Sequence, residues 1–319
     1  MSHRIAVVFC LALSAFAADW NPRRAADYLD ERQKEWFAWP RANNGAKPCI
    51  SCHTGLPYLM ARPALRKALG EKEPTQYETG LLESLRSRLD KKEPIGESLG
   101  TESVMAAFFL RTPAAYDRMW AMQVKDGAIS GGFKWFNTDL DPWEEPESQL
   151  FGASLAAVAI NEAPADYRDR PDVKERTAAL AAFLKGPHEK QPLQNRLLAA
   201  WASNDASLRK SVTAEVLAKQ SPEGGWTIES LGPWHTHANA PDPKPGNNTY
   251  ATAITTYVLL QCGTPKATVA KALGWLRSHQ SEHGYFYAES LNKQYKPDSM
   301  EIKFMRDAAT GWASLALLQ

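Results

Sequence analysis

The sequence of 319 residues predicts an all-α fold of six helix pairs that close into a ring, each pair with one inner and one outer helix. Segments rich in small residues alternate along the chain with charged, amphipathic segments, and such a pair recurs about every 50 residues. A repeat with two helices per unit forms either an open solenoid or a closed ring. We expect the ring, because neither end of the chain shows a distinct polar unit that would cap an open stack.

The two kinds of segment indicate where the helices lie. Small-residue helices, which would form the inside of the ring, are expected to begin near His53, Glu102, Ser148, Gln194, Asn248 and Asp307. Charged helices, which would form the outside, are expected at residues 25–37, 75–89, 113–123, 171–184, 205–220 and 265–280. In the charged segments alanine, leucine and charged residues recur at helical spacing, and Pro or Asp stands at several of the starts, as helix initiation favours.

Two similar phrases stand out in the C-terminal half. They read "SPEGGW" followed by "NTYATAITTYVLL", and "GWLRSHQSEHGYF" followed by "DAATGWASLAL". These phrases resemble the repeats of squalene cyclases and protein prenyltransferases, and the resemblance implies an (α/α)6 toroid. It covers about 100 residues at the C-terminus, becomes weaker toward the N-terminus, and implies the fold more strongly than an activity.

A short stretch near the N-terminus, "CISCHTGLPYLM", carries the chemistry. Cys49, Cys52 and His53 form a C-x-x-C-H sequence, which is the attachment sequence for c-type haem. The two thiols bond to the porphyrin and the histidine binds the iron. We therefore predict one covalent haem c per chain. A Cys49–Cys52 disulfide and half of a zinc site stay open as alternatives, although Cys262 has no cysteine or histidine near it that would complete a zinc site.

The ring suggests where the other iron ligand would come from. By the alignment of repeats, His53 begins the first inner helix, so the haem would lie at one mouth of the ring. A loop that precedes another inner helix, residues 232–248, contains His235 and His237 among prolines and polar residues. We predict that one of them contacts the haem, with His237 as the second iron ligand. Two solvent-exposed loop histidines are the open alternative.

Acidic residues allow a comparison with the enzymes of the resembled fold. The stretch "DLDPWEE", residues 139–145, resembles the paired acids with which the cyclases protonate an alkene. Pro142 replaces the last acid, so we expect a solvated loop. In the prenyltransferases an Asp, a Cys and a His bind zinc. Asp307 stands in such a position, but no cysteine or histidine accompanies it, and Cys262 is expected to be a buried, inert thiol.

Aromatic residues fall into two groups. Those at equivalent places in the repeats are expected to stack between units: Trp120, Phe133, Trp226, Trp275, Tyr285 and Phe286. Those in loops at the haem end are candidates for lining a ligand site: Trp135, Phe136, Trp143 and Trp234.

The N-terminal residues predict export. Residues 1–17 combine Arg4 with an apolar run that ends in Ala-Phe-Ala, the pattern of a cleaved signal peptide. The expected product is periplasmic or otherwise exported, a single domain of residues 18–319 with no transmembrane segment. A formal net charge of +1 gives no electrostatic reason to expect nucleic acid or an anionic membrane as partner.

Together these features predict an exported mono-haem cytochrome c-like protein. It would transfer electrons to a redox partner protein, or carry out haem-dependent redox chemistry on a small apolar molecule in the ring's cavity. Whether it is an enzyme stays open, and no catalytic residue is assigned. The alternatives are a cofactor-free terpene-cyclase-like enzyme and a binding scaffold, each with a Cys49–Cys52 disulfide.

Overall fold

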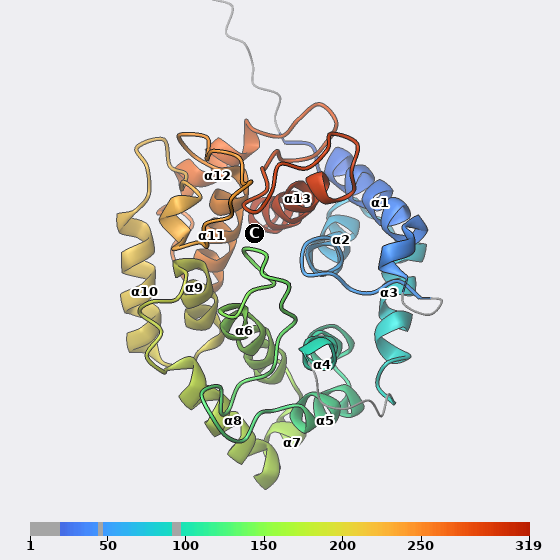
Figure 1. Ribbon diagram of the computed structural model, residues 1–319, viewed down its shortest axis with the longest axis vertical. Coiled ribbons are helices and arrows are strands. Elements are labelled where there is room, and N and C mark those ends of the chain that lie inside the picture. Colours follow the sequence, from blue (N-terminus) through green and yellow to red (C-terminus); the bar gives the residue numbers. More distant parts are fainter. Residues whose placement is uncertain (1–19, 44–46, 91–96) are drawn as a thin grey trace, which may run out of the picture.

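The computed structural model describes residues 20–43, 47–90 and 97–319. The expected signal peptide, residues 1–17, lies outside these ranges. The described residues form thirteen α-helices and three short 3-10 helices, with isolated bridges and no strand (Figure 1). The expected all-α class is confirmed. Within the same ranges, no helix has the length and apolar character needed to cross a membrane.

Six helices rich in small residues occupy the places that the sequence predicts for inner helices. They are α2 (Gly55–Ala68), α4 (Glu97–Leu110), α6 (Ser148–Asn161), α9 (Leu193–Ala202), α11 (Thr249–Gln261) and α13 (Phe304–Leu317). We call them the inner helices. In space α4 packs against α6, α6 against α9, α9 against α11, and α11 against α13. The last of them, α13, also packs against the first, α2, so the two ends of the series meet (Figure 1).

The contact between α13 and α2 depends on a small residue. A Cβ atom on Gly311 would lie 2.6 Å from Cβ of Pro57, closer than real Cβ atoms approach one another. Glycine therefore allows the backbones of α13 and α2 to come together. This close approach brings residues from the two ends of the described chain to one place.

The charged segments form a second set of helices. They are α1 (Pro22–Ala38), α3 (Gln76–Arg86), α5 (Pro113–Ala121), α8 (Pro171–Leu184), α10 (Ala206–Ala218) and α12 (Ala270–Arg277). Each packs against an inner helix: α1 on α2, α3 and α5 on α4, α8 on α6, α10 on α9, and α12 on α11. Burial differs between the two sets, since α6 buries most of its length and the amphipathic α10 buries only Val212 and Val216. A short helix, α7 (Ala165–Arg168), precedes α8.

Local sequence signals fix where several helices begin. Proline occupies the first turn of α1, α5 and α8, where its missing N–H costs nothing. Thr75 and Glu78 form a reciprocal capping box at the start of α3. The Asn248 side chain accepts a hydrogen bond from the Ala251 amide and caps α11.

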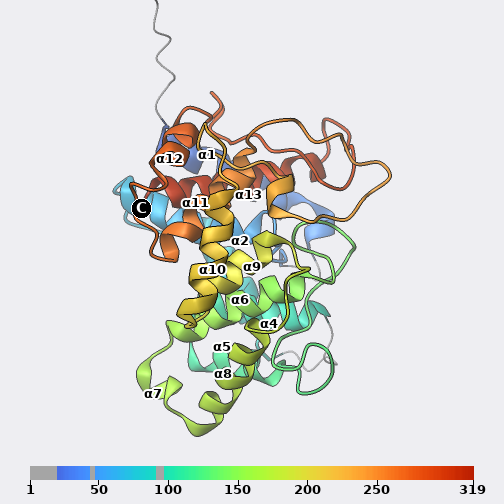
Figure 2. The ribbon, with the colours of Figure 1, turned by 90° about the vertical axis from the view of Figure 1, so that its left-hand side faces the viewer.

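Long loops lead into the later inner helices and position the site. Residues 122–147 precede α6, residues 219–248 precede α11, and residues 278–303 precede α13. They include the 3-10 helices η2 (Glu229–Leu231) and η3 (Glu301–Lys303), whereas η1 (Pro40–Ala42) precedes α2. The three loops extend from the same side of the molecule, on the right in Figure 2. A bridge between Asn239 and Lys293 joins the second loop to the third.

The aromatic residues of the repeats are structural, as expected. Trp120 and Phe133 contact each other with ring centroids 6.3 Å apart, and Trp226 and Phe286 are fully buried. Trp275 stacks on the His279 ring. The Trp275 contact is local, within one segment, so stacking between repeat units stays a prediction for that residue.

Candidate functional site

The segment with the two cysteines and the histidine forms a tight turn between η1 and α2. The backbone at Cys49 is fixed on both sides, because its N–H donates to the Ala42 carbonyl (2.8 Å) and its carbonyl accepts from Trp36 Nε1 (2.9 Å). The Ser51 hydroxyl oxygen accepts from the amides of Thr54 (3.1 Å) and Gly55 (3.0 Å). It thereby satisfies free N–H groups at the start of α2. The turn thus holds both thiols and the imidazole at one helix start.

The His53 ring is held in a fixed plane. It stacks on Phe304 of α13, with ring centroids 3.6 Å apart and an interplanar angle of 15°, and it meets Trp36 of α1 edge-on. The side chain is buried. Burial, with a contribution from Arg32, lowers the pKa of His53 to about 3. The imidazole is therefore neutral at physiological pH, the state in which it can bind a metal.

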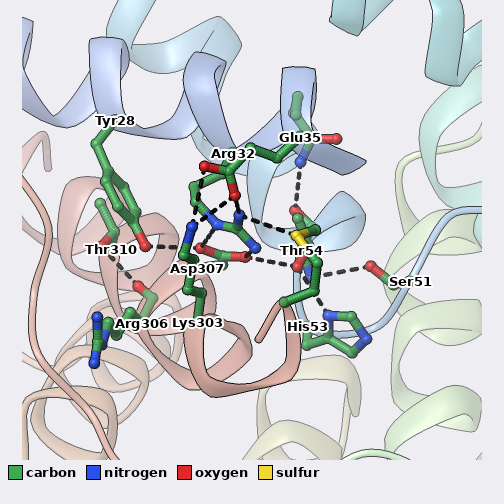
Figure 3. A network of polar contacts seen from close by, with 12 residues as sticks. Tyr28, Arg32, Glu35, Ser51, His53, Thr54, Lys303, Arg306, Asp307 and Thr310 are labelled. Atoms are coloured by element: carbon green, nitrogen blue, oxygen red, sulfur yellow. Dashed lines mark hydrogen bonds and ion pairs between the residues drawn. The ribbon is translucent and has the colours of Figure 1, made fainter. Parts of the chain in front are cut away.

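A chain of polar contacts runs from His53 through Thr54 to Asp307 on α13, and from there to α1 (Figure 3). His53 Nδ1 lies 2.8 Å from Thr54 Oγ1, and the Thr54 hydroxyl donates to Asp307 Oδ2 at 2.7 Å. Arg32 contacts both oxygens of Asp307, Nε to Oδ1 at 2.8 Å and Nη2 to Oδ2 at 3.0 Å. The Tyr28 hydroxyl adds a further hydrogen bond to Asp307 Oδ1 at 2.8 Å. Residues from α1, the turn and α13 thus meet around one buried carboxylate.

The ionisation of Asp307 follows from these contacts. Burial raises the pKa of Asp307, and the Arg32 guanidinium acts in the opposite direction. A two-point contact with guanidinium, together with hydrogen bonds from Tyr28 and Thr54, is an environment for a charged carboxylate. We therefore assign Asp307 as ionised at neutral pH.

The hydrogen-bond chain determines the tautomer of His53. A threonine hydroxyl has one proton, and Thr54 donates it to Asp307. Its oxygen must then accept from His53 Nδ1, so the proton of the neutral imidazole is on Nδ1 and the lone pair is on Nε2. Among the described residues, no hydrogen bond occupies Nε2. This is the arrangement that outer carboxylates impose on metal-binding histidines.

A small cavity lies beside His53. Its walls also include Trp143, Phe304, Asp141, Glu144 and Asn292, and its volume is about 50 Å³. That is room for a few water molecules. The walls opposite the turn come from the loops before α6 and α13. Of the loop aromatics expected to line a site, Trp143 does so.

The other loop aromatics have structural roles or lie at the surface. Trp135 is buried and its Nε1 donates to the Trp143 carbonyl at 2.9 Å. Trp234 Nε1 donates to the Ile228 carbonyl at 2.8 Å. Phe136 is 36% exposed. Of the four loop aromatics, Trp143 is the one that lines the cavity beside His53. A ligand-lining role for the other three stays a prediction.

The thiols of the three described cysteines are free. Cys52 is buried, whereas Cys49 and Cys262 are half-buried, so the expectation of a buried Cys262 holds in part. Burial raises the pKa of Cys49 and of Cys262 to about 11, and that of Cys52 well above its usual value. The thiols are therefore neutral at physiological pH. The Cys49–Cys52 disulfide of the alternative interpretations is not formed in this structure.

A second cluster contains Asp141, Glu145, His235 and His237. His235 Nδ1 is 2.9 Å from Glu145 Oε2 and 3.4 Å from Asp141 Oδ1, while His237 Nε2 is 3.1 Å from Asp141 Oδ2. The side chains of Asp141 and Glu145 have no exposed area. Burial, and then the contact with Asp141, raises the pKa of Glu145 to about 10.

This cluster corrects one expectation from the sequence. The stretch 139–145 was expected to be a solvated loop, which is right for the exposed Asp139 and wrong for Asp141 and Glu145. The reason is a contact between distant loops. Asn292 Oδ1 accepts from the Asp141 amide at 2.8 Å, and Asn292 Nδ2 donates to the Asp141 carbonyl at 2.7 Å. The loop before α13 therefore covers this stretch.

The structure also places the two histidines that were predicted to contact a haem. Both hydrogen-bond to the Asp141–Glu145 carboxylates, and neither lines the cavity beside His53. Asp141 contacts both of them and lines that cavity as well. Iron ligation by His235 or His237 stays a prediction. It requires the histidine to leave its carboxylate partner.

Sequence reasoning missed the residues that orient His53. Tyr28 and Arg32 lie one helical turn apart on α1, and Arg32 is buried. An arginine on the apolar face of an amphipathic helix was the available signal, because such a charge needs a buried partner. Asp307 was considered only as a possible zinc ligand, and the structure assigns it to Arg32 instead.

Comparisons with known proteins give no family for this chain. The sequence matches none of the models of protein families, and none of the curated proteins matches it.

Proposed function

We propose that this chain is an exported electron-transfer protein that carries one haem c, attached to Cys49 and Cys52 and ligated by His53. The observation that supports this most strongly is the chain from His53 through Thr54 to Asp307. It leaves Nε2 with its lone pair free beside a cavity, directly after two free thiols with haem-attachment spacing. Residues 1–17, with the pattern of a signal peptide, agree with export, because this cofactor is attached outside the cytoplasm.

We also propose that the fold is an (α/α)6 toroid. Two features support it. Direct contacts join α4, α6, α9, α11, α13 and α2 in that order, and α3 packs on both α2 and α4. Each inner helix has at least one charged helix packed on it, and for α13 these are α1 and α12. A toroid would place the starts of all inner helices, and so His53, at one mouth.

The residues around His53 fit a haem in their chemistry. Neutral imidazole with a free Nε2 is the usual proximal ligand, and reduced cysteines without a disulfide, as Cys49 and Cys52 are here, are the form that adds to a vinyl group. The cavity of about 50 Å³ is far smaller than a porphyrin. Haem attachment therefore requires the loop segments around Trp143 and Asn292 to lie further out than they do here. Both are loop segments without α-helix, which makes such a displacement easier than moving the helices.

The covalent step needs no further reagent. The Cys49 and Cys52 thiols would each add across one vinyl double bond, so that a carbon–sulfur bond forms and the thiol hydrogen moves to the neighbouring carbon. Nothing is oxidised or released, and the chain gains the full mass of the haem. When bound, the iron supplies a one-electron couple between its ferric and ferrous states.

The polar chain would adjust how His53 binds. Asp307 accepts a hydrogen bond from the Thr54 hydroxyl, which makes the Thr54 oxygen a better acceptor for His53 Nδ1–H. The imidazole thereby becomes a stronger electron donor at Nε2. Stronger donation favours the oxidised iron. The cavity beside His53 has a mostly apolar lining, but its volume of about 50 Å³ leaves room for a few water molecules and not for a small apolar substrate. A redox partner protein is therefore the better proposal for what exchanges electrons with this site.

The test is to express the full chain in a host that matures c-type cytochromes, and to measure the intact mass and the pyridine haemochrome spectrum. We expect the mass to rise by one haem. The double variant Cys49→Ser, Cys52→Ser should lose the covalent haem while retaining its helical circular dichroism, and Cys262→Ser, the matched control, should retain it. A purified wild-type chain without the added mass would overturn the haem proposal and favour the cofactor-free alternatives.

A further inference from the structure

Three donor groups meet between the loop before α6 and the loop before α11. Asp141, Glu145 and His235 each offer one ligand atom, and these atoms all lie within 4.8 Å of one another. Once Glu145 gives up the proton that its raised pKa holds, two carboxylates and an imidazole at such separations can contact a single cation. The proposed haem does not use these atoms.

Two oxygen atoms in this cluster lack a partner. Asp141 Oδ1 and Glu145 Oε1 are buried and accept no hydrogen bond. Buried carboxylates are normally hydrogen-bonded, ion-paired or bound to a metal. In the part of the chain that the structure describes, the ion-pair contacts of both acids are with histidines only. Asp141 Oδ1 lies 3.4 Å from His235 Nδ1, so the unpartnered oxygen points into the cluster.

The remaining atoms of Asp141 are occupied, which fixes the free one. Asp141 Oδ2 accepts from the His235 amide at 3.0 Å and lies 3.1 Å from His237 Nε2. The backbone of Asp141 is held from both sides by the Asn292 side chain. The free oxygen is therefore oriented before any ligand arrives, as in metal sites with an organised outer shell.

His235 has acids on both sides of its ring. Its Nε2 lies 3.5 Å from Glu147 Oε2, an ion-pair distance without a hydrogen bond, and its Nδ1 faces Glu145 and Asp141. With the proton on Nε2, toward Glu147, the Nδ1 lone pair faces the two carboxylates. A carboxylate behind an imidazole is a common feature of metal-binding histidines.

We infer that Asp141, Glu145 and His235 bind a divalent transition-metal ion such as Zn²⁺, Mn²⁺ or Fe²⁺. An imidazole ligand favours these ions over Mg²⁺ and Ca²⁺, which prefer oxygen ligands. Three protein ligands leave a coordination position for water or another molecule.

The test is an isothermal calorimetric titration of the purified full chain, first treated with a chelator, with Zn²⁺ and in a separate run with Mn²⁺. We expect one ion per chain in the wild type. Glu145→Gln and Asp141→Asn should each weaken binding by more than the about 100-fold that loss of an outer-shell partner causes. Asp139→Asn is the matched control, because it makes the same change of charge at an exposed position of the same loop. It should bind as the wild type does.

Further measurements separate this site from the turn and from misfolding. His235 is 40% exposed, so His235→Ala should fold even if a carboxylate variant does not, and it should show the same loss of affinity. The ion should raise the melting temperature of the wild type and of Asp139→Asn, but not of His235→Ala. Absence of binding in the wild type, or binding that survives in His235→Ala and disappears in His53→Ala, would overturn the inference.

Discussion

Asp141 lines the cavity beside His53, and Asp307 follows Met305, another residue of that cavity, by two positions. Both aspartates are buried, yet their surroundings are opposite. Asp307 belongs to α13, and its two oxygens are satisfied by Arg32, Tyr28 and Thr54. Asp141 belongs to a loop, has a second buried acid beside it, and leaves Oδ1 without a partner.

The difference suggests two ways in which a protein uses a buried carboxylate. In the first, the compensating charge is built in, and the network fixes the orientation of a neighbouring group, here His53. In the second, two acids are gathered on positions that the backbone holds in place, and the raised pKa of Glu145 keeps a proton there instead of a protein cation. The first arrangement contributes to folding in the absence of a ligand. The second gains most when a cation arrives.

The largest expected effect comes from exchanging each aspartate for asparagine. Asp307→Asn removes the buried carboxylate that contacts Arg32 at two points and leaves the guanidinium only the partly exposed Glu35 as a negative partner, which should lower the free energy of unfolding by about 3 kcal/mol. Asp141→Asn removes one of two neighbouring acids and should change it by about 1 kcal/mol or less when metal is absent. Urea unfolding followed by circular dichroism, with chelator present, measures both.

A double variant checks the cause of the larger loss. Arg32→Met combined with Asp307→Asn leaves no unpaired charge in the core, so it should be more stable than Asp307→Asn alone. If Asp307→Asn and Asp141→Asn lowered the free energy of unfolding equally, the two carboxylates would contribute equally to folding, which would contradict the difference between their partners.

Thr54 tests whether the satisfied network acts on His53 as well as on stability. Thr54→Val removes the group between His53 Nδ1 and Asp307 Oδ2 and should cost about 1–3 kcal/mol, because both buried atoms lose a partner. In the haem-loaded protein the imidazole would become a weaker donor, and the reduction potential should rise. Redox titration measures this shift.

Thr54→Ser is the matched control, since it keeps the hydroxyl and removes only a methyl group. The reduction potential of Thr54→Ser should stay close to that of the wild type. A potential that stays unchanged in Thr54→Val would show that the threonine is structural and does not adjust the ligand.

The helices could be predicted from sequence because their signals are local. The inner helix expected near Ser148 begins at Ser148, and the one expected near Gln194 begins at Leu193. Small residues, amphipathic spacing and capping residues all act within a few positions along the chain. The spacing of Cys49, Cys52 and His53 is a local signal as well, and the haem chemistry that it indicates stays a prediction.

The contacts that complete the two sites are not local, and so the sequence did not reveal them. Arg32 and Asp307 are separated by 275 residues, and Asn292 reaches Asp141 over 151 residues. Each pair depends on helix or loop packing that no short pattern encodes. Pro142 made residues 139–145 resemble an exposed loop, and only the covering loop before α13 explains why Asp141 is buried.

The smallest expected effect concerns Glu147, the acid behind His235. Glu147→Gln keeps an oxygen that can accept from His235 Nε2, at the position now 3.5 Å away, but removes the charge. The Zn²⁺ affinity should therefore fall by about 10-fold, a typical result for an outer-shell partner, while Glu145→Gln should cost far more. Calorimetry on the two glutamine variants measures the difference. Equal losses would make Glu147 a direct ligand and would extend the cluster from three residues to four.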